Sequence, residues 1–112
     1  MPQRHRMVKS ADFSAVCRSG KAASKYLVVH RLDQGGDAPA LVGFVVSKRV
    51  FPNATDRNRT KRRLRHLMRE RVGELDGCKL VIRALPAIRQ AEHKDIERSL
   101  DIALEKSGRK AP

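Results

Sequence analysis

The sequence predicts one α+β domain, a two-layer sandwich in which helices pack on a small mixed sheet. Its length of 112 residues is that of about one ordinary domain. Three segments carry the alternating or continuous apolar residues typical of strands, and three others repeat apolar residues at helical spacing. In chain order these segments give αββαβα. We expect residues 1–112 to form this single domain, with residues 1–8 and 107–112 as flexible basic tails.

The first element is a short helix that begins at Ser10, whose hydroxyl suits a helix N-cap. We expect the helix to reach Gly20. Phe13, Val16 and Cys17 recur at helical spacing and would form one apolar stripe. Such a stripe needs a sheet to lie on, so Cys17 is expected to be a small apolar residue of the core.

Two strands are expected next. Residues 26–32 are rich in β-branched and aromatic side chains, and residues 41–46 form the longest apolar stretch in the chain. This stretch is far shorter than the ~20 residues needed to cross a bilayer. The turn-rich residues 33–39 separate the two strands, and we expect them to pair antiparallel as a hairpin.

A long helix follows the second strand. Asn53 and Asp56 resemble a capping box at its start. From residue 54 to about residue 72 the chain contains no glycine or proline, which favours an uninterrupted helix. Gly73 and Gly77 mark the exit from this helix.

The last two elements are a third strand and a final helix. Residues 78–85 alternate apolar with mixed side chains, which predicts a strand with one apolar face, and Pro86 ends it. A helix from about residue 92 to residue 107 would end near Gly108 and place its apolar residues on one side. These apolar residues are Ile96, Leu100, Ala103 and Leu104.

Positive charge is concentrated in the middle of the chain. The formal net charge is +13, from 25 Lys and Arg against 12 Asp and Glu. Residues 47–73 carry ten of the basic residues against Asp56 and Glu70, and the stretch from 57 to 69 holds seven with no acidic residue among them. Like charges at this density repel one another unless a polyanion neutralises them. A nucleic acid is therefore the expected partner.

Helical projection distributes these basic residues around the long helix. At about 100° per residue, Leu64, Leu67 and Met68 form a narrow inward stripe. One flank is a basic ridge, which consists of Asn58, Arg62, Arg65 and Arg69. The inward stripe lapses near the helix start, so we expect residues 57–61 to overhang the sheet and to be exposed almost all round. A helix start with free N–H groups and several cations suits phosphate oxygens.

No catalytic constellation is visible in the sequence. His5, His30, His66 and His93 lack Cys, Asp or Glu at metal-ligand spacing, and no P-loop or GxSxG pattern occurs. Both cysteines are expected to be reduced thiols. Four aromatic residues are too few for a base-stacking sheet, and no helix-turn-helix precedes the basic helix. Recognition of structured RNA by its backbone and shape fits better.

The run RNRTKRRLR at residues 57–65 resembles the RNR motif of the bacterial ribonuclease P protein component. The likeness extends to SADF at 10–13, LVGFVVSKR at 41–49 and LVIRA at 80–84, and it covers about residues 4–105. The resemblance implies a ribosomal-protein-like fold with a left-handed βαβ crossover between the second and third predicted strands, against the usual hand. It also implies endonucleolytic removal of the 5′ leader of precursor tRNA, which generates the mature 5′ end.

The same resemblance implies the division of labour in this enzyme. The RNA subunit would carry catalysis with Mg²⁺ that it mainly binds itself, so no catalytic or metal-binding residue is expected in the protein. The implied partners are the catalytic RNA and precursor tRNA, with no membrane and no required protein partner. The two cysteines, which we expect to be reduced, indicate a protein of the cytoplasm. A cleft between the first helix and the sheet would bind the leader through Phe13, His30 and Lys48. The RNA-binding residues would be Arg57, Asn58, Arg59, Lys61, Arg62 and Arg65, together with Arg69 of the ridge.

The sequence departs from the family pattern at two places. Phe51 and Pro52 stand where the family commonly has a single glycine, and Cys17 and His30 stand where it often has aromatic residues. An alternative from another class is a ribosomal protein that only scaffolds ribosomal RNA, which the charge and size equally allow. A stand-alone protein nuclease is disfavoured, because paired carboxylates or histidines on one surface are missing.

Overall fold

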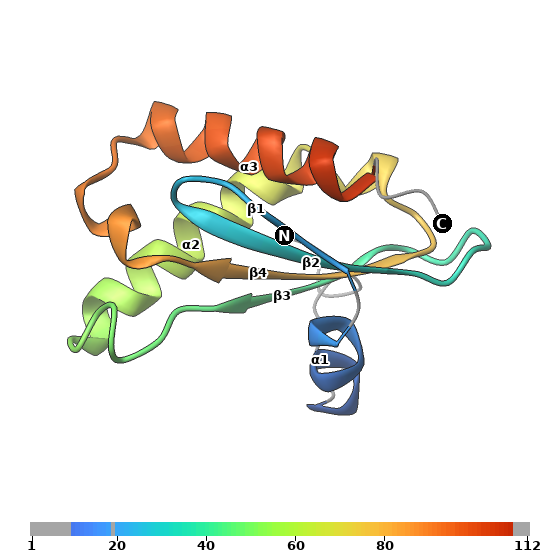
Figure 1. Cartoon of the computed structure of the whole chain (residues 1–112), viewed down its shortest axis with the longest axis horizontal. Coiled ribbons are helices and arrows are strands. Elements are labelled where there is room, and N and C mark those ends of the chain that lie inside the picture. Colours follow the sequence, from blue (N-terminus) through green and yellow to red (C-terminus); the bar gives the residue numbers. More distant parts are fainter. Residues whose placement is uncertain (1–9, 19, 109–112) are drawn as a thin grey trace.

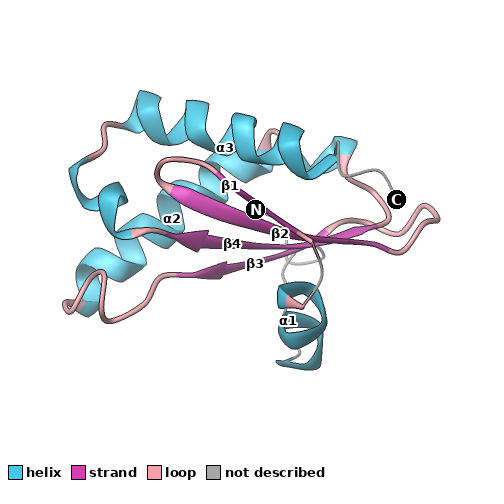
Figure 2. Cartoon of the chain, in the orientation of Figure 1, coloured by secondary structure: helices cyan, strands magenta, loops and turns pink. Residues whose placement is uncertain are grey.

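The computed structural model describes residues 10–18 and 20–108, with side chains from Ser14 onward within those ranges. It confirms the α+β class (Figures 1 and 2). The expected helices and strands are all present, and a short strand and two 3₁₀ helices are added to them. In chain order the elements are α1 (Ser10–Cys17), β1 (Lys21–Ala23), β2 (Leu27–Asp33), β3 (Leu41–Val45), α2 (Ala54–Arg69), η2 (Val72–Glu74), β4 (Cys78–Ala84), η3 (Pro86–Gln90) and α3 (His93–Gly108).

The four strands form one mixed sheet in the order β1-β2-β4-β3. β2 pairs antiparallel with β1 on one side and with β4 on the other, and β3 pairs parallel with β4. The predicted hairpin of residues 26–32 and 41–46 is therefore wrong. All seven residues of β2 pair with the seven of β4, and this long antiparallel ladder occupies the edge that the hairpin would have used.

Strand β1 was not predicted from the sequence. It has three residues, of which Ala22 alone is buried, so it carries no period that a pattern could reveal. The Ser24 backbone N–H donates to the Leu27 carbonyl oxygen at 2.9 Å and closes the turn between β1 and β2. The Ser24 hydroxyl also forms a hydrogen bond with that of Ser99, which links this turn to α3.

The two faces of the sheet are covered to different extents. Helices α2 and α3 pack on one face, where Leu64, Leu80, Ile82 and Leu100 belong to the main core. α1 lies on the opposite face (Figure 1), where Val16 packs with Val81. We call this second side the α1 face.

The apolar stripe predicted for α1 is only partly correct. Val16 is fully buried, but Cys17 is exposed, so its expected place in the core is wrong. Adjacent residues of a helix point ~100° apart. Because Val16 points at the sheet, the next residue, Cys17, points away from it. The side chain of Phe13 lies outside the described part of the chain.

Helix α2 connects the two parallel strands β3 and β4, which a two-residue turn cannot join. Asn53 caps it as expected, with its side-chain Oδ1 accepting from the Thr55 backbone N–H at 2.8 Å. The regular helix ends at Arg69, three residues before the predicted end, and η2 completes the turn toward β4. At the other end of the chain, α3 continues through Gly108, so residues 107 and 108 are helical. The other residues of the expected basic tails, 1–8 and 109–112, lie outside the described part of the chain.

A glycine joins the β2–β3 connection to the start of β4. The Gly77 N–H donates to the Ala38 carbonyl at 2.7 Å, and the Gly77 carbonyl accepts from the Gln34 N–H at 2.8 Å. Gly77 has φ of 82°, and a Cβ there would lie 2.7 Å from the Gly36 carbonyl oxygen. Only glycine therefore fits this position without displacing the backbone.

Both cysteines are free thiols, as expected. The buried Cys78 donates from Sγ to the Asp33 carboxylate at 3.0 Å, and Arg31 donates from Nε to the same oxygen at 2.8 Å. Burial, together with this hydrogen bond to Asp33, raises the pKa of the Cys78 thiol. Cys78 therefore stays protonated and acts as a small core residue at the first position of β4.

Arg71 links the end of α2 to α3. Its Nε lies 2.6 Å from the Asp101 carboxylate, its Nη2 lies 3.0 Å from Glu97, and its Nη1 donates to the Leu67 carbonyl at 2.6 Å. The hydrogen bond to Asp101 and then that to Glu97 raise the pKa of Arg71. All three nitrogens of the Arg71 guanidinium therefore have hydrogen-bond partners within the protein.

We expect Arg71→Met to lower the free energy of unfolding by about 1 to 2 kcal/mol, since hydrogen bonds to charged groups are lost while the apolar stem remains. Urea unfolding followed by circular dichroism at neutral pH measures the change. Arg98→Met is the matched control, because Arg98 is exposed and forms no ion pair among the described residues. Equal stability of the two variants would contradict the assigned role of Arg71.

Candidate RNA-binding surface

The basic ridge lies on the outer side of α2. Leu64, Leu67 and Met68 are buried, which confirms the inward stripe. Opposite this stripe, Asn58, Arg62 and Arg69 are exposed. These three side chains are thus accessible to a ligand in solution.

Arg65, the fourth ridge residue, is half-buried. Its guanidinium carbon lies 5.9 Å from the centre of the Phe44 ring of β3, within the range of a cation–π contact. Arg65 therefore also packs α2 against the edge strand. Its replacement would disturb packing as well as charge.

The start of α2 overhangs the sheet less than predicted. Asn58 and Arg59 are exposed, but Arg57 and Lys61 are half-buried. The prediction that residues 57–61 are exposed almost all round is therefore wrong. The Arg57 Nη1 donates to the carbonyl oxygens of Phe51 at 2.8 Å and of Pro52 at 2.9 Å. The preceding loop folds back on the helix start, and one cation of the motif binds that loop.

The basic residues of α2 form no ion pairs with the acidic residues of the described ranges. Among the described residues, ion pairs involve Arg31 and Arg71, and none involves a basic residue between 57 and 69. Arg69 instead lies with its Nη2 3.1 Å from the His66 ring. Such a surface has its lowest energy when an external anion neutralises it.

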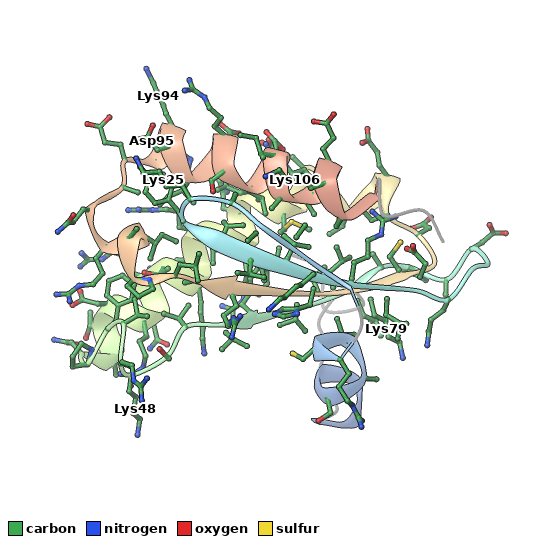
Figure 3. The ribbon with its side chains drawn as sticks, viewed as in Figure 1. Lys25, Lys48, Lys79, Lys94, Asp95 and Lys106 are labelled. Carbon is green, nitrogen blue, oxygen red and sulfur yellow. The ribbon has the colours of Figure 1, made fainter. Side chains whose placement is uncertain are left out.

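The predicted leader-binding residues do not meet at one point. His30 lies on the α1 face of β2, opposite Lys21 of β1 and Val81 of β4, and it is only 5% exposed. Lys48 is exposed and follows β3, beside the start of α2 and away from α1 (Figure 3). The α1 face runs from one of these positions to the other.

Sequence reasoning missed three cations on the α1 face. Arg83 of β4 is exposed and pairs with Val28 and Val45, so it lies between His30 and Lys48 along the sheet. Lys21 is exposed on β1, and Lys79 lies toward the end of the sheet that carries α1 (Figure 3). The alternation in residues 78–85 contains this signal, because every second residue of that strand faces away from the main core.

The described residues contain neither a metal-ligand cluster nor a membrane-spanning helix. They contain no group of three or more His, Cys, Asp or Glu side chains that could hold a metal ion. Within the same part of the chain, no helix combines the length and apolar character needed to cross a membrane.

Comparison with known proteins bears on what this surface binds. The family model described as Ribonuclease P matches residues 1–108. A relative named ribonuclease P protein component from Streptomyces avermitilis is 40% identical over 116 residues, covering 95% of this chain and 94% of that protein. One of the same name from Kocuria rhizophila is 46% identical over 99 residues, covering 88% and 87%.

Solved structures show the same fold. A Staphylococcus aureus RNase P protein mutant matches with a TM-score of 0.83 at 24% identity, over 93% of this chain and 88% of that chain. The RNase P protein from Thermotoga maritima matches with a TM-score of 0.74 at 22% identity, over 89% and 96%. The family match over nearly the whole chain confirms the resemblance seen in the RNR motif. The chain belongs to the ribonuclease P protein family.

Proposed function

We propose that the chain binds the catalytic RNA of ribonuclease P through α2 and the 5′ leader of precursor tRNA along the α1 face. As a ribonuclease P protein component, it serves tRNA 5′ processing as a subunit of an endoribonuclease. One observation carries the proposal for α2. The exposed cations of that helix have no acidic partners among the described residues. The ribosomal scaffold alternative loses its support, because the matched family and relatives are ribonuclease P proteins.

The sheet separates the two proposed contacts. α2 packs on the core face, and α1 packs on the opposite face, so a ligand on the ridge and a ligand on the α1 face do not compete for the same side chains. The loop with Lys48 lies between them at the start of α2 (Figure 3). One protein can therefore bind the catalytic RNA and the leader of the substrate at the same time.

Along the α1 face we assign the leader contacts to Lys48 and Arg83 before His30. Both are exposed and cationic, and phosphate contacts of this kind position a strand without reading its sequence. His30 is almost completely buried, which leaves little of its ring for a ligand. Phe13 stays a candidate from the family resemblance.

The chemistry of cleavage belongs to the RNA in this proposal. Mg²⁺ prefers several oxygen ligands and usually keeps part of its water shell. We assign Mg²⁺ mainly to the RNA subunit, as the family resemblance implies. The protein contributes binding, orientation and charge neutralisation, and the free thiols of Cys17 and Cys78 agree with a place in the reducing cytoplasm.

The protein alone should not cut precursor tRNA, whereas the protein with its RNA subunit should cleave at the mature 5′ end. The reason is that the sequence shows no catalytic constellation, and the described residues contain no group of three or more His, Cys, Asp or Glu that could hold a metal ion. End-labelled precursor, resolved on a gel, gives the measurement. Sustained cleavage at that site by nuclease-free protein without RNA would overturn the assignment.

Arg62→Ala should weaken binding of the catalytic RNA by about 1 to 3 kcal/mol and reduce the magnitude of the salt slope by about one. Arg62 is exposed and forms no ion pair among the described residues, so the loss reports an RNA contact. Filter binding at several salt concentrations measures both quantities. Arg98→Ala on α3 is the control and should leave the slope unchanged. A variant that melts well below the parent but keeps its salt slope would assign Arg62 a structural role.

Lys48→Ala and Arg83→Ala should each weaken binding of leader-bearing precursor to the holoenzyme about five- to tenfold, the loss of one charged contact. Leaderless tRNA should bind almost as before, because the lost phosphate contact exists only with the leader. Equilibrium binding to the reconstituted holoenzyme compares the two ligands. Equal losses for both would move these residues off the leader path.

A further inference from the structure

A pocket lies on the flank of α2 opposite Arg65, between α2, η3 and the start of α3. It has a volume of about 370 Å³. We call it the arginine pocket, because three arginines from two separate elements line it. Its lining includes Phe51, Asp56, Arg59, Arg63, Ile88 and Arg89.

The charges of this pocket call for an anion. Arg59 and Arg63 come from α2, and Arg89 comes from η3, which the fold brings to the same opening. No ion pair joins any of the three to an acidic residue within the described ranges. Three guanidinium groups that line one opening repel one another, and a phosphate, whose oxygens each accept charge-assisted hydrogen bonds, neutralises them best.

The remaining lining residues favour a ligand with other groups besides a phosphate. Phe51 is half-buried and Ile88 is 3% exposed, so part of the wall is apolar. Asp56 lines the same space, and its carboxylate forms no hydrogen bond or ion pair among the residues described. A bare phosphate would be repelled by this carboxylate. A ligand that also carries an aromatic ring and hydrogen-bond donors would use all three features.

We propose that the arginine pocket binds one guanine nucleotide of an RNA. Its phosphate would lie against Arg63 and Arg89, and its base against the partly exposed ring of Phe51. Guanine presents adjacent N–H donors at N1 and N2, which match the two oxygens of the Asp56 carboxylate. The inference rests on the proposed function, since it names a second RNA contact on a flank of α2 that the ridge does not cover.

The first test uses guanosine 5′-monophosphate and the full chain. In two-dimensional amide NMR, shifts should be confined to α2, η3 and the Phe51 loop, with a Kd on the order of 1 mM, equivalent to about −4 kcal/mol. Adenosine 5′-monophosphate, guanosine and inorganic phosphate should each bind at least several-fold more weakly. Shifts of equal size with inorganic phosphate would reduce the pocket to an anion site and overturn the proposal, as would no shift with the guanine nucleotide.

Variants separate the two halves of the site. Arg63→Gln and Arg89→Gln should each weaken guanosine 5′-monophosphate about tenfold, because one charged hydrogen bond is lost. Asp56→Asn should remove the preference for guanine over adenine without abolishing binding of either. Arg98→Gln is the control, an exposed arginine outside the pocket, and should have no effect. Thermal melting of each variant establishes that it is folded.

The catalytic RNA then distinguishes failure of this inference from failure of the proposed function. If Arg89→Gln binds the RNA as tightly as the parent while Arg62→Gln binds it more weakly, the ridge contact stands and the pocket inference is wrong. If the parent neither binds the RNA nor supports cleavage, the proposed function is wrong whatever the nucleotide titrations show. Weakening by both variants, together with the guanine preference, supports both.

Discussion

The insertion of β4 between β2 and β3 is the constraint on which the rest of this structure depends. Because β3 and β4 are parallel neighbours, the chain must cross one face of the sheet between them, and α2 is that crossing. Leu64, Leu67 and Met68 then have to pack on the sheet. This packing alone decides which side of α2 faces outward, and so places the basic residues in solvent.

The contrast between Arg71 and the other arginines of the region shows how charge is used. Arg71 is held by Asp101, by Glu97 and by the Leu67 carbonyl, and it joins two helices. Arg62 and Arg63, a few residues earlier, have no such partners in the described part of the chain. Acidic residues of α3 thus stabilise the fold at one end of α2. The other end keeps its repulsion, which a polyanion relieves.

Local pattern was enough to predict the long elements of the fold. The interruption-free helix, its Asn53 cap and the alternating strand at residues 78–85 all follow from the behaviour of adjacent residues. Which strands pair with one another does not follow from adjacent residues. The hairpin was wrong because strand pairing is decided by long-range packing, and β1 was missed because three residues give no period. Likewise the ridge could be read from helical spacing, whereas the arginine pocket needs Arg89 from a distant 3₁₀ helix.

The two hydrogen bonds from Arg57 to the Phe51 and Pro52 carbonyls bear on the entropy of binding. Ordering a free backbone costs about 1 to 2 kcal/mol per residue. A loop that α2 already holds in place loses little of this freedom when a ligand arrives, since most of the ordering took place during folding. Lys48 and Arg49, which belong to the same connection, are thereby presented by a pre-organised segment. By ordering this loop, Arg57 would increase the affinity for RNA independently of any contact that it makes with RNA itself.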